Sequence, residues 1–227
     1  MKKSNGVRVN RGEIESITPK TENQALAFNH WDSGHNLILS GSAGTGKTFM
    51  ALYFAFKELL ENPDKYRKVM IVRSVVPTRE IGFLQGSIGE KKEPFSSPYP
   101  SICDEIFGYN GAYGKLTSTK KLEFEITSHI RGRTYDQTII VVDEAQNCNF
   151  HELDSIITRV GNDSRIIFAG DHKQSDFTHK SEKEGIIQFI SIVEQMSSFR
   201  IIEFGWADII RSDFVRDYIM TKEMMGY

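Results

Sequence analysis

The chain has 227 residues, of which 39% are hydrophobic and 26% charged, and a formal net charge of -2 at pH 7. This is the composition of an ordinary globular protein, and it excludes a surface that is basic throughout, so any nucleic-acid site has to be a local patch. Cys103 and Cys148 form no CxxC pair and predict neither a disulfide framework nor a zinc site. No apolar run resembles a signal peptide or nears the roughly 18 residues of a membrane span, so we expect a cytoplasmic protein with no membrane partner.

Apolar segments alternate with helical patterns along most of the chain. This order is typical of an α/β fold with a mainly parallel sheet and helices on both faces. Strands that are buried on both faces read as near-continuous Ile and Val runs, as these segments do. The predicted strands are residues 36–40, 68–74, 138–143, 165–170 and 199–204, and the predicted helices are residues 47–62, 149–161, 182–196 and 211–225.

Residues 75–137 interrupt the alternation. They contain the Gly- and Pro-rich stretches PFSSPYP and FGYNGAYGK, and one alternating strand candidate at residues 121–127. Long irregular segments in compact domains are usually functional. We therefore predict an irregular insertion after the second strand.

The stretch GSAGTGKT, between a predicted strand and a predicted helix, matches the phosphate-binding pattern G-x-x-x-x-G-K-[ST]. Its glycines let backbone N–H groups surround phosphates, and the helix N-terminus adds a positive dipole end. Within it, Lys47 is predicted to reach the β- and γ-phosphates and Thr48 to ligate Mg²⁺. The nucleotide-binding candidates are Gly41, Ser42, Ala43, Gly44, Thr45, Gly46, Lys47 and Thr48.

The run IIVVDEAQN places two acids at the end of an apolar strand. In P-loop NTPases an Asp in this position holds Mg²⁺, which makes Asp143 the second predicted metal ligand. Glu144 beside it is a candidate general base that deprotonates water for attack on the γ-phosphate. The alternative is that Glu144 only caps the following helix.

Two glutamines complete the candidate site. Gln174 and Asp171, in GDHKQSD after the next strand, are placed to sense the γ-phosphate or the attacking water, unless this loop is a solvated turn. Gln24, early in a helix before the phosphate loop, has an amide suited to both N6 and N7 of adenine. With no N-K-x-D guanine motif present, the set favours ATP.

Taken together, the motifs resemble those of the PhoH-like proteins. The features are TPKTENQ, GSAGTGKT, VRS followed by GFLQG, RGRT, VVDEAQN, GDHKQSD and DIIRSDFV, in the order of that family and spanning residues 18–215. The resemblance implies a three-layer RecA-like fold similar to the first domain of superfamily 1 helicases, with ATP and Mg²⁺ bound and ATP hydrolysed. It divides the chain into a basic arm at residues 1–17 and one ATPase domain at residues 18–227 that includes the insertion.

Arg211 matches an arginine of the family that acts as a finger on the γ-phosphate. Superfamily 1 helicases supply this residue from a second RecA-like domain, which a chain of this length does not contain, so we expect a neighbouring subunit to donate it. Head-to-tail donation predicts a homo-oligomeric ring, with a hexamer favoured. The alternatives are that Arg211 merely caps or pairs on its helix, or that Arg131 or Arg133 is the finger.

Basic and aromatic residues alternate between positions 73 and 133, which suits single-stranded RNA or DNA through charge pairing and base stacking. Acidic residues in the same region favour an ordinary mixed surface. Three functions therefore stay open: a helicase-like ATPase acting on single strands, an ATP-dependent regulatory module that works with a partner such as a nuclease, and, less favoured by Glu144 and Gln174, a P-loop kinase.

Overall fold

The structure is a computed structural model that describes residues 14–74, 95–130, 132–171 and 180–226. Six strands form one sheet in the order β3-β2-β4-β5-β1-β6, and every neighbouring pair is parallel. The strands are β1 (Asn36–Gly41), β2 (Lys68–Arg73), β3 (Leu122–Ile126), β4 (Thr138–Asp143), β5 (Arg165–Gly170) and β6 (Phe199–Phe204). The predicted parallel α/β fold is confirmed.

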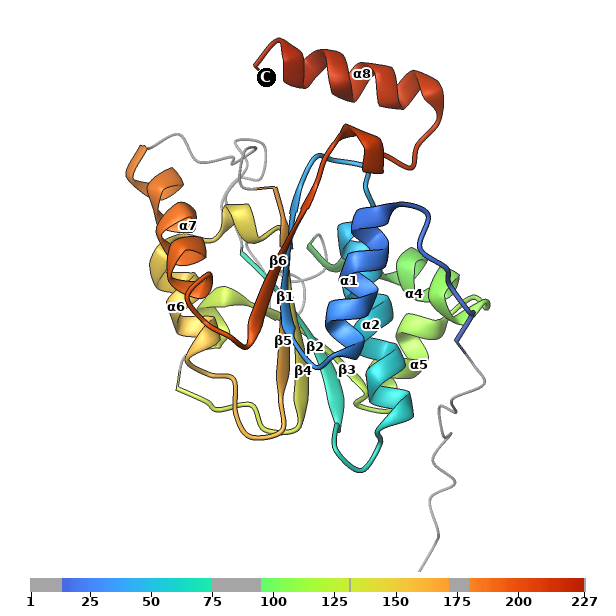
Figure 1. Cartoon of the computed structure of the whole chain (residues 1–227). Coiled ribbons are helices and arrows are strands. Elements are labelled where there is room, and N and C mark those ends of the chain that lie inside the picture. Colours follow the sequence, from blue (N-terminus) through green and yellow to red (C-terminus); the bar gives the residue numbers. More distant parts are fainter. Residues whose placement is uncertain (1–13, 75–94, 131, 172–179, 227) are drawn as a thin grey trace, which may run out of the picture.

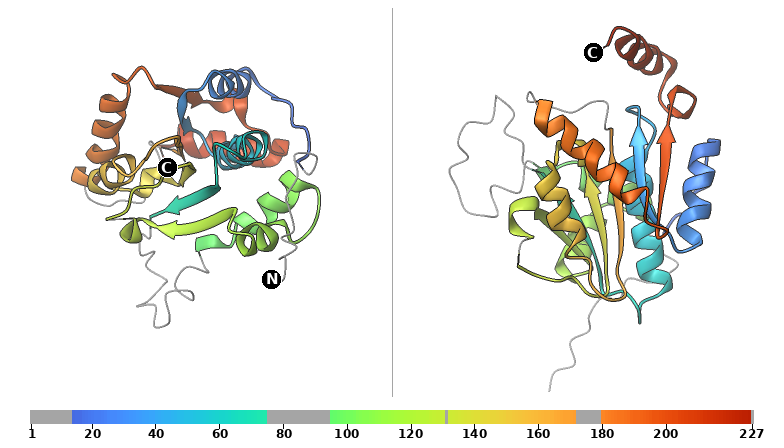
Figure 2. Two further views of the ribbon diagram at one scale, coloured as in Figure 1. Left: turned by 90° about the horizontal axis from the view of Figure 1, so that it is seen from below. Right: turned by 60° about the vertical axis from the view of Figure 1, so that its left-hand side comes forward.

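Helices cover both faces of the sheet and make three layers (Figures 1 and 2). On one face lie α1 (Glu22–Asp32), α2 (Lys47–Glu61), α4 (Tyr99–Phe107) and α5 (Ala112–Ser118), and on the other α6 (Phe150–Ile157) and α7 (Lys180–Val193). The final helix, α8 (Asp213–Met224), lies above the carboxyl ends of the strands.

Alternate residues of each strand enter opposite cores, as the two-residue period of a strand requires. On β2, Val69 and Ile71 pack in the core of the α2 face, whereas Met70 and Val72 pack in the core of the α6 and α7 face. Since all four are fully buried, the strand reads as one continuous apolar run. This explains why the sequence showed apolar blocks without polar alternation.

Much of the predicted insertion is regular structure. Its strand β3 joins the sheet edge in register with β2, and α4 and α5 add buried residues to the same core as α2. Both helices are short and bounded by Pro98, Gly108 and Gly111. Those residues hid the helices, because Gly and Pro in a sequence usually mark loops.

A buried arginine fixes α1, which carries Gln24, against the sheet. Arg165 of β5 donates from Nη2 to the carbonyls of Trp31 and His35, each at 2.7 Å, and from Nη1 to Glu58 at 3.2 Å. Its guanidinium carbon lies 3.2 Å from the centroid of the Trp31 ring. Several charge-assisted bonds and a stacked ring compensate the desolvation of the cation.

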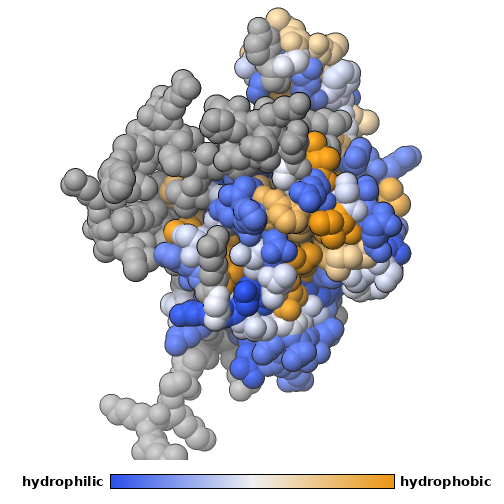
Figure 3. Space-filling view, turned by 90° about the vertical axis from the view of Figure 1, so that its left-hand side faces the viewer, coloured by the Kyte–Doolittle hydropathy of each residue, from blue (hydrophilic) through white to orange (hydrophobic). Residues whose placement is uncertain are grey.

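The helix α8 differs from the other helices because none of its residues is buried. Phe214 and Tyr218 are 83% and 64% exposed. Apolar side chains also reach the surface among polar ones on the α6 and α7 side (Figure 3), where Ile187 and Ile192 of α7 are exposed. No helix in the described ranges is long and apolar enough to cross a membrane.

Candidate functional site

The phosphate-loop sequence connects β1 to α2 and closes against β6. Gly41 has a φ of 122°, and the amide of Ser42 donates to the Phe204 carbonyl at 3.0 Å. A Cβ on Gly41 would lie 2.0 Å from the same carbonyl oxygen, so only glycine fits here. Gly44 and Gly46 also have positive φ, at 75° and 84°. These conformations let the loop turn around the N-terminus of α2, which is an anion-binding arrangement.

Lys47, the first residue of α2, folds back over this loop. Its Nζ donates to the carbonyls of Gly41 and Ser42, at 2.6 Å and 2.7 Å. Burial lowers the pKa of Lys47, while the carboxylates of Asp171, Glu144, Asp143 and Glu223 act in the opposite direction. The ammonium group is thus held between the loop and a set of acids.

Asp143 lies at the end of β4, 4% exposed, and both its oxygens accept hydrogen bonds. Thr48 Oγ1 donates to Oδ1 at 2.7 Å, and the Tyr99 hydroxyl donates to Oδ2 at 2.9 Å. Burial raises the pKa of Asp143, while the hydrogen bonds from Thr48 and Tyr99 lower it. The fold therefore brings together the two predicted metal ligands, which are far apart in sequence.

Glu144 has left-handed backbone angles, φ 51° and ψ 44°, which a residue other than glycine adopts at a cost of about 1–2 kcal/mol. Its side chain is held by Gln146, whose Nε2 donates to Glu144 Oε2 at 2.5 Å. Gln146 Oε1 accepts from the amide of Asp171 at 3.0 Å. Gln146 thus joins the loop after β4 to the loop after β5, and Gly170 makes room for it, because a Cβ there would lie 2.3 Å from Gln146 Oε1.

Gln24 is 4% exposed and contacts the phosphate loop. Its Nε2 donates to the Thr45 carbonyl at 3.2 Å, and its Oε1 accepts from the Lys20 amide at 2.8 Å. A primary amide has two N–H groups and two lone pairs, so these bonds use half of its capacity. Gln174, Arg131 and residues 1–13 of the predicted arm lie outside the described residues.

The segment after β6 and the helix α8 pack on the phosphate loop of the same chain. The Ile210 amide donates to the Gly44 carbonyl at 3.1 Å, and a Cβ built on Gly44 would lie 3.0 Å from Arg211 Cγ. Glu223 Oε2 accepts from Ser42 Oγ at 3.0 Å and from Trp206 Nε1 at 2.5 Å. Arg211 was expected to reach a phosphate loop of a neighbouring subunit; within one chain it already lies beside its own.

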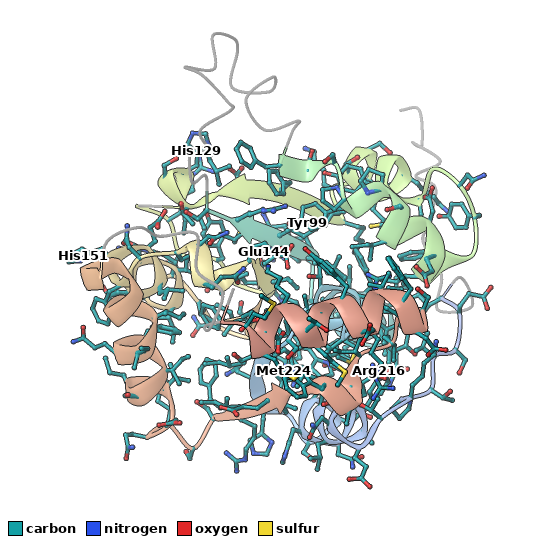
Figure 4. The ribbon with its side chains drawn as sticks, turned by 90° about the horizontal axis from the view of Figure 1, so that it is seen from above. Tyr99, His129, Glu144, His151, Arg216 and Met224 are labelled. Atoms are coloured by element: carbon teal, nitrogen blue, oxygen red, sulfur yellow. The ribbon has the colours of Figure 1, made fainter. Side chains whose placement is uncertain are left out.

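Figure 4 shows this end of the molecule from above, with Glu144 and Tyr99 at the carboxyl end of the sheet and α8, marked by Arg216 and Met224, lying across it. Tyr99 is predicted only as one of the aromatic residues that stack on single strands, an interpretation that its burial contradicts, and Gln146 and Glu223 have no predicted role. Gln146 is the last residue of the DEAQ motif, directly after the two acids and Ala145, so a local sequence signal for it existed. Tyr99 and Glu223 had none, because only tertiary packing brings them to the site.

The donor set fits a magnesium ion shared with a nucleotide. A hydroxyl and a buried carboxylate lie in contact beside the phosphate loop, and Mg²⁺ is usually bound by one or two carboxylates together with substrate phosphates and water. Among the residues that the structure describes, no group of three or more His, Cys, Asp or Glu side chains could hold a metal. A hydroxyl and a carboxylate would leave the other coordination positions of such a metal to phosphate and water oxygens.

A parallel sheet of this order, with a phosphate loop after β1 and a carboxylate after β4, defines a P-loop NTPase fold of the RecA-like type. In agreement, the structure of the Pyrococcus furiosus Hef helicase domain superposes with a TM-score of 0.50 and 15% identity, over 84% of this chain and 40% of that one. The model of the family described as "PhoH-like protein" matches residues 16–222. The chain belongs to the PhoH family.

Two curated relatives show the extent of the match. A PhoH-like protein of Mycobacterium tuberculosis (strain ATCC 25618 / H37Rv) is 30% identical over 207 residues, covering 90% of this chain and 57% of the relative. Protein PhoH2 of Bacillus subtilis (strain 168) is 36% identical over 172 residues, covering 72% of this chain and 38% of the relative. The chain thus spans between about a third and three fifths of the length of these two proteins.

Proposed function

We propose that the chain binds ATP together with Mg²⁺ and hydrolyses it. The observation that carries this proposal is the contact between Thr48 and Asp143 at 2.7 Å beside the phosphate loop, with Glu144 directly following the aspartate. Phosphates would lie on the loop amides and Lys47, and the base would lie near Gln24. Thr48 and Asp143 would hold the metal, which would neutralise the charge that develops on the phosphate oxygens.

Glu144 is the proposed general base. It accepts a proton from a water molecule whose oxygen attacks the γ-phosphorus, while the bond from that phosphorus to the bridging oxygen breaks and ADP leaves with the electron pair. The hydrogen bond from Gln146 holds one carboxylate oxygen of Glu144. The other oxygen is then the one assigned to the water. Gln174 stays a predicted sensor of the same water.

ATPase assays of the parent protein and Glu144→Gln test the base. We expect hydrolysis to fall by about 10²-fold or more, the range of a lost general base, while ATP binding is kept. Glu194→Gln, which removes an exposed acid after α7, is the matched control and should behave as the parent. A Glu144→Gln variant that hydrolyses ATP at the parent rate would overturn the assignment.

We further propose that single-stranded RNA or DNA is the partner that the hydrolysis serves. Support comes from the basic residues of the insertion, of which Lys120 and Arg133 are exposed in its described part. The aromatic residues Tyr99 and Phe107 are buried in the core and do not contribute to this support. The expected result is ATP hydrolysis that rises when a single strand is added. If neither RNA nor DNA changes the rate, the second candidate is favoured, a module in which ATP governs assembly with a partner such as a nuclease.

Arg211 is proposed as the residue that stabilises the charge of the γ-phosphate. It acts either on the ATP of its own chain or on the ATP of the neighbouring subunit in a ring, with a hexamer favoured. Mixing Arg211→Ala protein with Glu144→Gln protein separates the two cases. If the arginine acts across subunits, a mixed interface has an intact Glu144 from one chain and an intact Arg211 from the next, so activity returns. If it acts on its own chain, as its position beside Gly44 favours, the mixture stays inactive. Measuring the molecular mass of the assembly in the presence of ATP tests whether the protein forms a ring.

A further inference from the structure

Tyr99 connects the insertion to the metal-binding carboxylate. It is the first residue of α4 and is fully buried, and its hydroxyl donates to Asp143 Oδ2 at 2.9 Å. Its ring packs against Phe124 of β3, with 5.6 Å between the ring centroids. Tyr99 therefore reaches Asp143 from α4 of the insertion, and not from the phosphate loop or the loops that follow β4 and β5.

The two oxygens of Asp143 have different partners. Oδ1 accepts from Thr48, the other predicted metal ligand, whereas Oδ2 accepts from Tyr99. A carboxylate that is bonded at one oxygen cannot rotate freely about its last single bond. Tyr99 thus fixes the plane of the carboxylate and leaves Oδ1 with Thr48.

The hydroxyl suits this task because it stays a donor. A phenolic hydroxyl is protonated at neutral pH, so Tyr99 can donate to the carboxylate. Its location is also fixed, since α4 packs in the main core through Cys103, Ile106 and Phe107. Arg73, which pairs with Asp143 in strand register, donates to the Phe95 carbonyl at 3.3 Å and so holds the chain just before α4.

We propose that Tyr99 is a positioning residue for magnesium: through Asp143 Oδ2 it orients the carboxylate that, with Thr48, binds the metal of the metal–nucleotide complex. The proposal rests on the proposed nucleotide site and adds a residue to it. Groups that orient metal ligands typically change metal affinity by about 10- to 100-fold when they are removed. The Tyr99 hydroxyl donates to Asp143 rather than to the phosphate loop, so its removal should act mainly on metal binding.

The test compares Tyr99→Phe with Tyr109→Phe. Both changes remove one phenolic oxygen, but the Tyr109 hydroxyl is buried without a hydrogen-bond partner among the described residues. Mn²⁺ binding to each protein with ADP is measured by electron paramagnetic resonance, and ADP binding is measured separately in EDTA. Unfolding temperatures check that both variants are folded, which the retained ring favours.

We expect Tyr99→Phe to bind Mn²⁺ about tenfold more weakly in the presence of ADP, with ADP affinity in EDTA equal to that of the parent, and Tyr109→Phe to match the parent in both. In an Asp143→Asn background, Tyr99→Phe should cause no further loss. Parent-like Mn²⁺ binding by Tyr99→Phe would overturn the proposal, as would an equal loss of ADP affinity in EDTA, which indicates a general structural effect. A parent protein that binds no Mn²⁺ with ADP would instead overturn the nucleotide site on which the proposal rests.

Discussion

Ser42 of the phosphate loop donates a hydrogen bond to Glu223 of α8, with 3.0 Å between Oγ and Oε2. Glu223 also contributes to the electrostatic environment of Lys47. A carboxylate of the chain thus lies beside the lysine and the loop that are proposed to receive phosphates. The negative phosphates and the carboxylate of Glu223 repel each other, so removing the charge of Glu223 should strengthen nucleotide binding.

Glu223→Gln is therefore expected to tighten ADP binding about fivefold, which corresponds to the roughly 1 kcal/mol between two unit charges about 4 Å apart in water. The gain should shrink in high salt, because ions screen exposed charges. Asp217→Asn, on the same helix and exposed, is the control. Calorimetry at two salt concentrations measures both effects, and equal affinities for the two variants would contradict the prediction.

Asp143 makes stability depend on pH. Burial raises its pKa above that of the unfolded chain, so the folded state holds the proton more tightly, and the free energy of unfolding falls as pH rises through the folded pKa. Above the folded pKa, the ionised carboxylate thus destabilises the protein free of nucleotide and metal. Asp143→Asn should raise the unfolding temperature in EDTA at pH 7–8, by about 2–4 °C per kcal/mol for a chain of this size, and less in acid.

Thermal unfolding of both proteins across this pH range is the measurement. The gain in stability should accompany a loss of Mn²⁺ binding, since the amide is a poorer ligand for a hard cation than the carboxylate is. A variant that is less stable than the parent at pH 8 would show that the hydrogen bonds from Thr48 and Tyr99 to Asp143 outweigh its burial.

Gln146 joins Glu144 to the Asp171 amide. In Gln146→Glu the donor to Glu144 is replaced by a second carboxylate, and the two like charges repel. We expect hydrolysis to fall by at least tenfold, which corresponds to about 1.4 kcal/mol on the barrier. ADP affinity should stay within about twofold of the parent, because these bonds of Gln146 hold the residues that follow β4 and β5. Steady-state rates and ADP titrations check this, and an unchanged rate would remove Gln146 from the proposed mechanism.

Gly41 and Gly34 require glycine for different structural reasons. Both have positive φ, but a Cβ on Gly41 would lie 2.0 Å from the Phe204 carbonyl oxygen, while one on Gly34 has nothing within 4 Å. Gly34→Ala should cost only the backbone term, about 1–2 kcal/mol. Gly41→Ala should cost at least about 2 kcal/mol more, since the clash involves backbone that cannot rotate away. Urea unfolding measures both, and equal losses would contradict the steric explanation.

The regular parts of the fold were predictable from the sequence, because strands buried on both faces have a strong apolar signal. All five predicted strands exist, and the candidate at residues 121–127 is the edge strand β3. The helices α4 and α5 were missed because they are short and their boundaries contain Gly and Pro. The predicted helix at residues 149–161 ends at Ile157, since the chain leaves the helix to pair Tyr135 with Val160.

Some residues of the candidate site were likewise predictable from the sequence, and others were not. Contiguous motifs predicted that Lys47, Thr48, Asp143 and Glu144 would meet at one end of the sheet, and the structure places them there; their roles stay predictions. Tyr99 and Glu223 lie on helices whose position depends on packing rather than on any local pattern. Their contacts with Asp143 and Ser42 are therefore visible only in three dimensions.

The position of β1 has a consequence for how the chain acquires its structure. β1 comes first among the strands, yet its partners are β5 and β6, which come fifth and last. During synthesis one edge of β1 therefore stays unpaired until β5 has been made and the other until β6 has been made. The bond from the Ser42 amide to the Phe204 carbonyl closes at this last stage. Pairings so distant in sequence form slowly. The phosphate loop, although it is a short continuous motif, becomes a formed loop only when nearly the whole domain has folded around it.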